Sequence, residues 1–310
     1  MKNLVSLSNI SPKDFQGLID KAIEIKSRKS MYTRSLFEKS LIMIFQAPSL
    51  RTRVSFEVAM TQLHGSAINY YSENSPWGLG KESMEDVART LSQYCDVISA
   101  RIYSHSELKK LAKNASVPVI NMMTNDGHPC QILGDFLTIQ EKLGKTKGLK
   151  IAYLGDAENN VTYSLMRACA LTGNSLTIAC PKNKEYSPKE RVVTETKKLA
   201  KKYKNKAAVI TTDPLKAAKN ADVIYTDSWM SYRIPQEEKN RRLKDLKPFQ
   251  VNKKVFSQAK KTAVFMHCLP AMRGHEVTEE IIDGKKSIVF PQAQNRLHIQ
   301  KAILMKLLNK

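Results

Sequence analysis

The sequence predicts an α/β protein with two doubly wound parallel-sheet domains and a cleft between them. Short apolar segments alternate with amphipathic helical segments along the chain, a pattern typical of parallel sheets with helices on both faces. The alternation stops and restarts near residue 145. The 310 residues are enough for two hydrophobic cores.

The first domain is expected over residues 1–140. Ser11-Pro12 marks the start of a helix over residues 11–29, because serine caps helices and proline suits their first turn. Residues 72–83 are rich in Ser, Gly and Pro and should form a loop. Strands are predicted at residues 40–45, 66–71, 96–101 and 117–122, and helices at residues 53–65, 84–95, 105–115 and 128–144.

The second domain is expected over residues 145–285. The end of the chain should form a short strand and a helix from residue 287 onward, and we expect the helix, residues 292–310, to pack back on the first domain. Strands are predicted at residues 147–156, 174–180, 221–227 and 262–270, and helices at residues 161–173, 182–206 and 214–220.

The composition argues against several protein classes. No apolar run reaches the ~20 residues that span a bilayer, and the N-terminal segment lacks the apolar core of a secretory signal. The five cysteines are scattered without a CxxC pair. We therefore expect reduced thiols in a cytoplasmic protein, without a metal site or a membrane partner.

The net charge of +21 raises the question of a nucleic-acid partner. The densest basic segment, residues 182–206, does not interleave aromatic residues with its lysines as a base-stacking platform would. We interpret it as the solvated face of a helix and expect no nucleic acid to bind. Attraction of anionic substrates is the alternative use of this charge.

Polar residues follow six of the predicted strands. Doubly wound sheets bind ligands at the carboxyl ends of their strands, so these residues should line a binding cleft. The clusters are Ser49–Arg53, Arg101, His128, Asn159–Asn160, Asp227–Ser231 and His267–Pro270.

The segment Ser49–Arg53 precedes a predicted helix. A helix N-terminus with nearby arginines suits a phosphate group, and a surface ion pair is the alternative for Arg51 and Arg53. Neither a Walker loop nor the three glycines of a dinucleotide turn is present, so we expect no nicotinamide cofactor.

Three motifs, SLRTR (49–53), HPCQ (128–131) and HCLP (267–270), occur in this order. With them the chain resembles the aspartate/ornithine carbamoyltransferase family over nearly its whole length. HCLP, DSWMS (227–231) and QAQNRLHIQKA (292–302) resemble the ornithine branch. The resemblance implies that an amine, ornithine in this branch, attacks carbamoyl phosphate at carbon, giving citrulline and phosphate without a metal or cofactor.

The resemblance also implies roles for individual residues. Catalytic roles fall to Arg101, His128, Asp227, Cys268 and Arg296. Ornithine contacts fall to Asn160, Asp227, Ser231 and Tyr232. Carbamoyl phosphate contacts fall to Ser49, Leu50, Arg51, Thr52, Trp77, Lys81, Arg101, His128, Gln131, Cys268, Leu269 and Arg296.

The chemistry fits these roles. Thr52, Arg101 and His128 are our candidates for donors to the carbonyl oxygen, where charge develops during attack. The amine has a pKa of about 10.4 and must lose a proton before it attacks. Asp227 with Cys268 could orient it, and we do not expect Cys268 to be a covalent nucleophile.

Each assignment has a purely structural alternative. These are a helix cap for His128, Asp227 and Ser231, a carboxylate pair for Arg101, an ordinary helix position for Gln131, a turn residue for Asn160, a small core residue for Cys268 and a helix-surface ion pair for Arg296.

In the family, the loop that corresponds to residues 72–83 reaches into the active site of a neighbouring subunit. The resemblance therefore implies a homotrimer, or a multiple of trimers, with shared active sites. Trp77 stands where ornithine enzymes often carry Gln or His, and Lys81 where the aspartate branch uses lysine. The alternatives are an interface aromatic for Trp77 and a solvated side chain for Lys81.

Three departures from the family pattern lie close to the expected substrates. Leu50 replaces a threonine, Trp77 replaces Gln or His, and SYRIP (231–235) replaces Ser-Met-Gly. Ornithine is the leading substrate, while putrescine, an N-acylated ornithine and a catalytically silent paralogue stay open as alternatives. The proline-rich insertion and the lysine after HCLP that mark the N-acylornithine branch are both missing.

Overall fold

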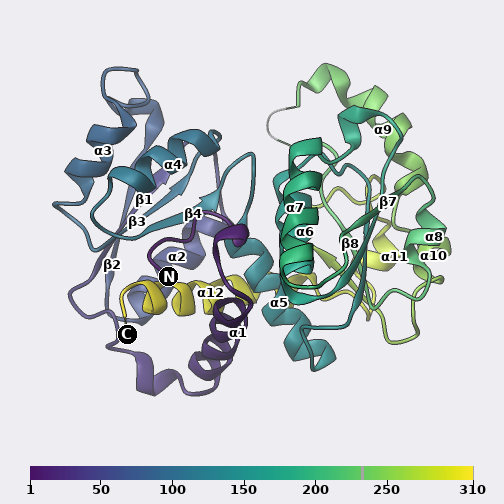
Figure 1. Cartoon of the computed structure of the whole chain (residues 1–310), viewed down its shortest axis with the longest axis horizontal. Coiled ribbons are helices and arrows are strands. Elements are labelled where there is room, and N and C mark those ends of the chain that lie inside the picture. The colour runs from purple at the N-terminus through teal and green to yellow at the C-terminus, as the bar shows by residue number, and fades with distance from the viewer. Residues whose placement is uncertain (232–233, 310) are drawn as a thin grey trace. The chain divides into compact units, whose positions relative to one another are not determined.

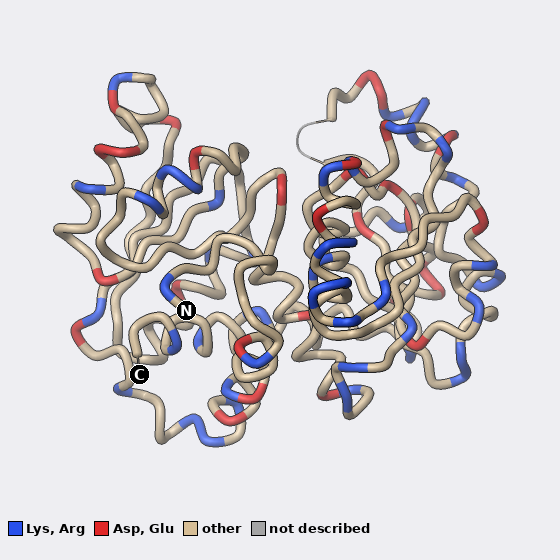
Figure 2. The backbone as a smooth tube through the Cα atoms, viewed as in Figure 1, with Lys and Arg blue, Asp and Glu red and all other residues tan. Residues whose placement is uncertain are grey.

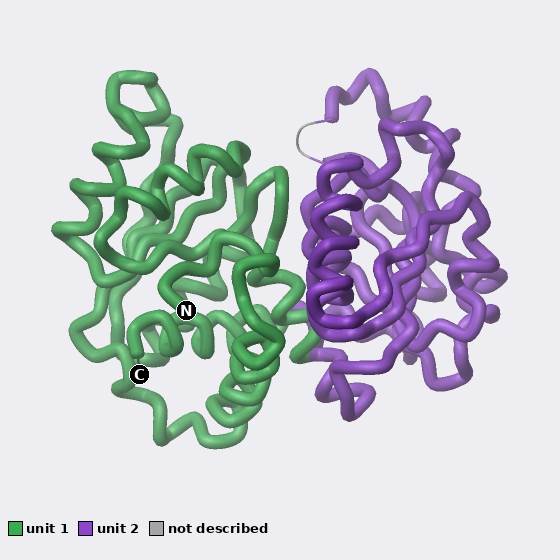
Figure 3. The backbone as a smooth tube through the Cα atoms, in the orientation of Figure 1, with its two compact units in different colours: residues 1–137, 294–310 green, residues 138–293 purple. Residues whose placement is uncertain are grey.

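The computed structural model describes residues 1–231 and 234–309. The chain divides into two compact units (Figure 3), which we call unit 1 and unit 2. Unit 1 comprises residues 1–137 and 294–310, and unit 2 comprises residues 138–293. The last residues of the chain therefore belong to the same unit as the first.

Two helices carry the chain from one unit to the other. The chain leaves unit 1 within α5 (Pro129–Leu143) and returns within α12 (Val289–Leu307) (Figure 1). Both helices therefore contribute residues to each unit. The part of α12 in unit 1 carries Arg296, one of the predicted site residues.

Unit 1 contains a parallel sheet with the strand order β2-β1-β3-β4. The residues of β3 and β4 are buried, whereas β2 lies at the edge and is partly exposed. This is the burial expected for a parallel sheet covered by helices. The strands are β1 (Ser40–Phe45), β2 (Ser66–Tyr71), β3 (Val97–Arg101) and β4 (Val119–Met123), and the helices besides α5 and α12 are α1 (Pro12–Ser27), α2 (Arg51–Gln62), α3 (Met84–Leu91) and α4 (His105–Asn114).

Serines determine where three helices of unit 1 begin. The side chains of Ser11, Ser83 and Ser104 each accept a hydrogen bond from the backbone N–H three residues later, at the starts of α1, α3 and α4. Each bond satisfies one of the N–H groups that a helix leaves without an internal partner. The start predicted from Ser11-Pro12 is thus confirmed.

Unit 2 contains a second parallel sheet, with the strand order β7-β6-β5-β8-β9. The prediction of two parallel α/β sheets is therefore confirmed. The strands are β5 (Lys150–Leu154), β6 (Ser175–Ala179), β7 (Val209–Thr211), β8 (Val223–Thr226) and β9 (Val264–His267), and the helices besides α5 and α12 are α6 (Asn160–Thr172), α7 (Glu190–Lys202), α8 (Pro214–Ala218), α9 (Lys239–Leu246), α10 (Lys253–Phe256) and α11 (Glu279–Ile282).

The strand predicted just before the last helix is wrong. Residues from Val289 onward already belong to α12, and Ser287 forms an isolated bridge to Phe265 in β9. The apolar run Ile288–Phe290 suggested a strand. A short apolar run cannot distinguish a strand from the first turn of a buried helix.

Two further differences concern the basic part of unit 2. The helix predicted over residues 182–206 is shorter, because α7 begins only at Glu190 and a 3₁₀ turn at Lys184–Tyr186 precedes it. Pro188 lies between them, and the residue before a proline avoids helical geometry. Strand β7 was not predicted, since it has only three residues and lies exposed at the sheet edge.

Lysine and arginine residues are spread along the chain in both units (Figure 2). On α7, Val192 and Leu199 are buried while Lys197, Lys198 and Lys201 are exposed. The lysines of this helix thus occupy its solvated face, as the sequence predicts. Among the described residues, no helix is long and apolar enough to cross a membrane.

Both sheets contain a point where the direction of winding reverses. In unit 1, β1 lies between β2 and β3, and in unit 2, β5 lies between β6 and β8. In unit 1, the loops after β1 and β3 therefore lead to helices on opposite faces of the sheet. The same holds in unit 2 for the loops after β5 and β8. Doubly wound sheets bind ligands in the crevice that such a reversal opens. We call these two places the switch point of unit 1 and the switch point of unit 2.

Candidate active site

At the switch point of unit 1, the loop after β1 is fixed to the end of β3. Arg101, the last residue of β3, is 7% exposed. Its Nε donates to the carbonyl oxygen of Pro48 at 3.2 Å, and its own carbonyl accepts the backbone N–H of Gln46 at 2.9 Å. The guanidinium group of Arg101 is thus positioned at the carboxyl edge of the sheet.

The same loop ends at the N-terminus of α2. Ser49 Oγ accepts the backbone N–H of Thr52 at 3.2 Å, and the helix begins at Arg51. The side chain of Leu50 makes no capping hydrogen bond and is 72% exposed. The first turn of α2 offers backbone N–H groups of the kind that bind anions.

Arg296 connects three helices of unit 1. Its Nη1 donates to Gln131 Oε1 at 2.5 Å, and its Nη2 donates to Thr52 Oγ1 at 3.3 Å. Gln131 Nε2 in turn donates to Asp135 Oδ1 at 2.8 Å. Arg296 is only 2% exposed, so the surface ion pair considered as its alternative is excluded. Three predicted residues, from α2, α5 and α12, therefore meet.

A glycine makes room for this arginine. A Cβ at Gly134 would lie 3.3 Å from Arg296 Cδ, closer than ordinary van der Waals contact. Helix α5 thus approaches the buried arginine through a position without a side chain. A side chain at position 134 would require Arg296 to shift by a few tenths of an ångström.

His128 lies just before α5 and is 6% exposed. Burial lowers the pKa of its imidazole well below the ordinary value, and the positive charges of Arg296, Arg101 and Arg51 lower it further. His128 is therefore neutral at pH 7 and can serve as a hydrogen-bonding group, not as a cation. Arg296, Arg101 and Arg51 thus lie near enough to act on one imidazole, an arrangement that suits a negatively charged ligand.

The two arginines of the SLRTR motif differ in environment. Arg53 Nη1 donates to the hydroxyl of Tyr71 at 2.8 Å, and its Nε lies 3.6 Å from Glu57 Oε1. The Arg51 side chain forms no hydrogen bond or ion pair with any residue in the described part of the chain. The ion-pair alternative therefore applies to Arg53, whereas Arg51 remains available for a ligand.

The two candidates on the loop of residues 72–83 are held within unit 1. Trp77 is half-buried and packs against a hydrophobic cluster that includes Met84 and Val87. Lys81 is exposed, and its backbone N–H donates to Pro76 O at 2.8 Å. Within the described ranges, neither side chain forms a hydrogen bond or ion pair.

At the switch point of unit 2, Asn159 organises the loop after β5. Its Oδ1 caps α6 by accepting the backbone N–H of Thr162 at 2.8 Å. Its Nδ2 donates to Tyr153 Oη at 2.9 Å and to Asp156 O at 2.6 Å. Asn160, the predicted ligand, is the first residue of α6 and is half-buried. The cap is thus Asn159, and Asn160 stands beside it at the helix N-terminus.

On the other side of this switch point, Asp227 follows β8. Its Oδ1 accepts the backbone N–H of Ser228 at 2.8 Å and the thiol of Cys268, with Sγ at 3.0 Å. Asp227 and Cys268 therefore meet as predicted. Ser231 is exposed, and its carbonyl accepts the backbone N–H of Ile234 at 3.0 Å. Tyr232 lies outside the described residues.

His267 and Cys268 follow each other at the end of β9. The potential ligand atoms of Asp227, His267 and Cys268 lie within 4.8 Å of one another, a spacing that could hold a metal ion. However, His267 Nδ1 accepts the backbone N–H of Leu269 at 2.8 Å, and its Nε2 lies 3.3 Å from the buried Glu276. The imidazole is thus oriented by its own neighbours, and the thiol is a hydrogen-bond donor to Asp227.

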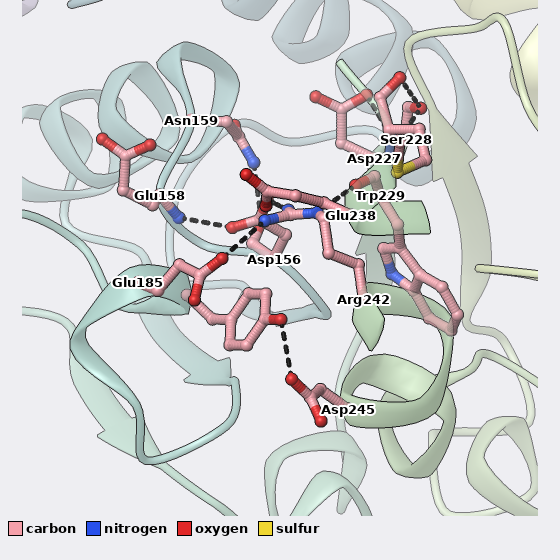
Figure 4. Close-up of polar contacts among 12 residues, drawn as sticks. Asp156, Glu158, Asn159, Glu185, Asp227, Ser228, Trp229, Glu238, Arg242 and Asp245 are labelled. Carbon is pink, nitrogen blue, oxygen red and sulfur yellow. Dashed lines mark hydrogen bonds and ion pairs between the residues drawn. The ribbon is translucent and has the colours of Figure 1, made fainter. Parts of the chain in front are cut away.

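Unit 2 also holds a polar network that the sequence did not reveal (Figure 4). Arg242, on α9, is 3% exposed and contacts Asp156, Glu185 and Trp229. Burial raises the pKa of Asp156 to about 6, although the Arg242 guanidinium acts in the opposite direction. The sequence shows two adjacent arginines, Arg241 and Arg242, and nothing in it indicates which one is buried.

The chain matches two family models that together span nearly its full length. Residues 2–141 match the carbamoyl-P binding domain of aspartate/ornithine carbamoyltransferase, and residues 147–307 match its Asp/Orn binding domain. Among curated relatives, ornithine carbamoyltransferase of Anoxybacillus flavithermus is 47% identical over 99% of this chain and 96% of its own length. The Bacillus subtilis enzyme of the same name is 45% identical over 100% of this chain and 94% of its own length.

Solved structures agree with these sequence relatives. Ornithine carbamoyltransferase from Pyrococcus furiosus superposes with a TM-score of 0.93 at 43% identity, over 99% of this chain and 97% of that one. Ornithine transcarbamoylase from Giardia lamblia gives a TM-score of 0.91 at 39% identity, over 100% of this chain and 98% of that one. The motifs, the fold and these relatives lead to one conclusion: the chain belongs to the aspartate/ornithine carbamoyltransferase family.

Proposed function

We propose that the protein transfers the carbamoyl group of carbamoyl phosphate to the side-chain amine of L-ornithine, giving L-citrulline and phosphate. The observation that carries the proposal is the group of cations around His128 at the switch point of unit 1. The full-length relatives support it, since they are named for the same reaction.

Unit 1 offers the groups that a dianionic phosphate needs. Arg51 and the N-terminus of α2 supply positive charge and N–H donors, with Ser49 and Thr52 beside them. Arg51 has no protein partner to give up within the described chain. We assign phosphate binding to this loop. At position 50, where the leucine side chain offers no hydroxyl, backbone N–H groups bind the phosphate.

The carbamoyl end is assigned to the buried polar groups next to this loop. When the amine attacks, negative charge develops on the carbonyl oxygen, and a donor placed there in advance is worth about 3–4 kcal/mol. Thr52, Arg101 and His128 are the donors we assign. Arg296 holds Thr52 and Gln131 in place through its two Nη groups. A neutral His128 suits this role because it donates without adding charge.

Unit 2 is assigned to the amine substrate. The ornithine side chain carries an ammonium group of pKa about 10.4, which must lose a proton before its lone pair can attack carbon. Asp227 attracts and orients the amine, and the thiol of Cys268 holds the carboxylate through its 3.0 Å contact. Asn160 and Ser231, with Tyr232, are assigned to the amino-acid end. Cys268 forms no covalent intermediate in this scheme.

A direct assay tests the function. Purified protein would be given carbamoyl phosphate with ornithine, putrescine, N-acetylornithine, N-succinylornithine, lysine or aspartate, while phosphate release and ureido product are measured. We expect turnover with ornithine well above every other amine. Turnover of putrescine above ornithine would overturn the substrate, and no turnover with any amine would overturn the transferase assignment.

We further propose that the protein forms a homotrimer, or a multiple of trimers, with shared active sites. Apolar side chains are exposed on neighbouring parts of unit 1: Ile68 and Tyr71 on the edge strand β2, Val54 on α2, and Leu79 on the following loop. Burying exposed apolar side chains in a subunit interface favours association. Analytical ultracentrifugation should give a trimer or a multiple of it, and Ile68→Glu should shift the mass toward the monomer.

We place the enzyme in the cytoplasm. Its five cysteines are all free thiols in the structure, and four of them are buried. Reduced thiols are typical of the reducing cytoplasm. Fractionation of the source cells, with carbamoyl transfer to ornithine as the marker, would test this location.

A further inference from the structure

Arg242 contacts three different loops of unit 2 at once (Figure 4). Its Nε donates to the carbonyl oxygen of Trp229, in the loop after β8, at 2.9 Å. Its Nη2 donates to the carboxylate of Asp156, in the loop after β5. Its Nη1 lies 3.4 Å from Glu185 in the 3₁₀ turn after β6. Its Cζ lies over the ring of Tyr186, 5.0 Å from the ring centre.

Two of these loops carry the residues assigned to the amine substrate. Asp156 is hydrogen-bonded through its carbonyl to Asn159, the cap that precedes Asn160. Trp229 lies two residues after Asp227 in a turn closed by Ser228, whose Oγ accepts the N–H of Met230. The planar guanidinium group of Arg242 therefore fixes the distance between the loop after β5 and the loop after β8, at the switch point of unit 2.

A second contact joins the same two loops. Gly155 has a φ of 114°, a conformation that strongly favours glycine. A Cβ there would lie 2.6 Å from Trp229 Nε1, so the buried indole packs directly on the backbone of the loop after β5. The loops are thus held together by a packing contact and, independently, by the charge-assisted bonds of Arg242.

We propose that Arg242 is a positioning residue that locks the loop after β8 to the loop after β5, so that Asp227 and Asn160 meet the amine substrate in one fixed geometry. The proposal rests on the proposed function, because it concerns the site assigned to ornithine. Arg242 is not a catalytic residue here, because its guanidinium group binds Asp156, Glu185 and the carbonyl of Trp229 and not a substrate.

The decisive variant is Arg242→Lys. An ammonium group retains the charge opposite Asp156, yet one point charge cannot replace a planar fork that donates to Asp156 and Trp229 together. We expect the KM for ornithine to rise at least about tenfold, whereas the KM for carbamoyl phosphate stays within about twofold. A purely structural role would change both constants and the melting temperature together.

The neighbouring Arg241 provides a matched control. It lies on the same helix, its side chain is 48% exposed, and it pairs with Glu185 at 2.6 Å and Glu238 at 3.0 Å. Arg241→Lys makes the same chemical change one residue away. Both KM values should stay within about twofold of the wild-type values, because exposed pairs contribute little.

A spectroscopic measurement separates loop geometry from activity. The chain has two tryptophans, so Trp77→Phe leaves Trp229 as the only one. In that background, Arg242→Lys should shift Trp229 fluorescence to longer wavelength as the loop loosens, and Arg241→Lys should not.

Each outcome of these experiments decides the proposal. If Arg242→Lys does not fold, the double variant Asp156→Asn with Arg242→Gln replaces the buried charges by a neutral pair and should show the same selective rise. An unchanged KM for ornithine in either folded variant would overturn the proposal. An equal rise in the KM values for both substrates would also overturn it, and so would failure of both variants to fold. Absence of ornithine turnover in the wild-type protein would instead refute the proposed function.

Discussion

The two switch points have the same topology and opposite charge. In unit 1 the reversal between β1 and β3 gathers Arg51 and Arg101 around a neutral His128. In unit 2 the reversal between β5 and β8 gathers Asp156 and Asp227. The comparison teaches that the winding of the sheet fixes where a ligand binds, whereas the side chains at the strand ends fix its charge. The proposed function assigns the anionic carbamoyl phosphate to unit 1 and the cationic amine to unit 2, in keeping with this difference.

The switch points also differ in how their charges are held. In unit 1, Arg101 donates to the carbonyl oxygen of Pro48, and Arg296 donates to Gln131 and Thr52. In unit 2, Asp156 is paired with a buried arginine, and Asp227 accepts a thiol and a backbone N–H. Asp227 forms no ion pair with a cation in the described part of the chain, whereas Asp156 supports the loop.

The largest effect is expected from removing a cation at the switch point of unit 1. Arg51→Ala should lower kcat/KM for carbamoyl phosphate by at least about 10²–10³-fold, because a preorganised donor to the reacting anion is lost. Steady-state kinetics would measure this loss.

Arg53→Ala is the matched control for Arg51→Ala, since Arg53 lies on the same helix and pairs with Glu57 and Tyr71 at the surface. It should stay within about threefold of the wild type. Equal losses of kcat/KM in both variants would mean that the SLRTR motif stabilises helix α2 and does not bind the ligand.

The next effect is expected from removing a negative charge at the switch point of unit 2. Asp227→Asn keeps the shape of the side chain but weakens attraction for the amine, so kcat/KM for ornithine should fall by about 10²-fold. The KM for carbamoyl phosphate should barely move. Initial-rate kinetics would measure both values. Comparable changes for both substrates would contradict the assignment of one substrate to each unit.

A smaller effect concerns the pH dependence of folding. The pKa of His128 is lower in the folded state than its ordinary value of about 6.5, so the unfolded chain binds more protons below that pH. The stability due to His128 is therefore present above about pH 6.5 and is lost as the pH falls, by up to about 1.4 kcal/mol per pH unit.

His128→Gln should make the pH dependence of unfolding shallower below pH 6.5, as urea denaturation at several pH values would show. The site then differs from unit 2, where Asp156 is the buried group whose pKa is raised. An unchanged slope in the variant would mean that His128 titrates normally despite its three arginine neighbours.

The smallest effect is expected at Leu50. Leu50→Thr restores one hydroxyl to the phosphate loop, and because Leu50 is exposed, no core contact is lost. The KM for carbamoyl phosphate should fall by about threefold, the value of one modest hydrogen bond. If the KM is unchanged, the backbone N–H groups already satisfy the phosphate at this position.

Much of the fold could be predicted from periodicity. Parallel strands that are covered on both faces consist of continuous apolar runs, and the helices between them are amphipathic. Strand β7 escaped prediction since three exposed residues give no such signal. The strand predicted at residues 287–290 was wrong because an apolar run at the start of α12 looks the same in sequence.

The site could be predicted only in part. Polar residues after predicted strands, among them Ser49, Arg101 and Asp227, are the candidates, because doubly wound sheets bind ligands at strand ends. Spacing alone could not separate Arg51 from Arg53, and only the family resemblance favoured Arg51. Nothing in the sequence separated Arg242 from Arg241, because the two differ only in which way the helix turns their side chains. That direction is set by the elements against which the helix packs.

The sequence by itself therefore determined the class of fold, the family motifs and the chemical types of residue at the strand ends. These are local properties, encoded in spacing and composition. Only the tertiary structure decided which charges are buried together, that Arg296 reaches Thr52 across more than 240 positions of chain, and that Arg242 joins two loops. Such contacts depend on the crossing of distant segments, and a charge becomes decisive only when burial removes the water that would otherwise screen it.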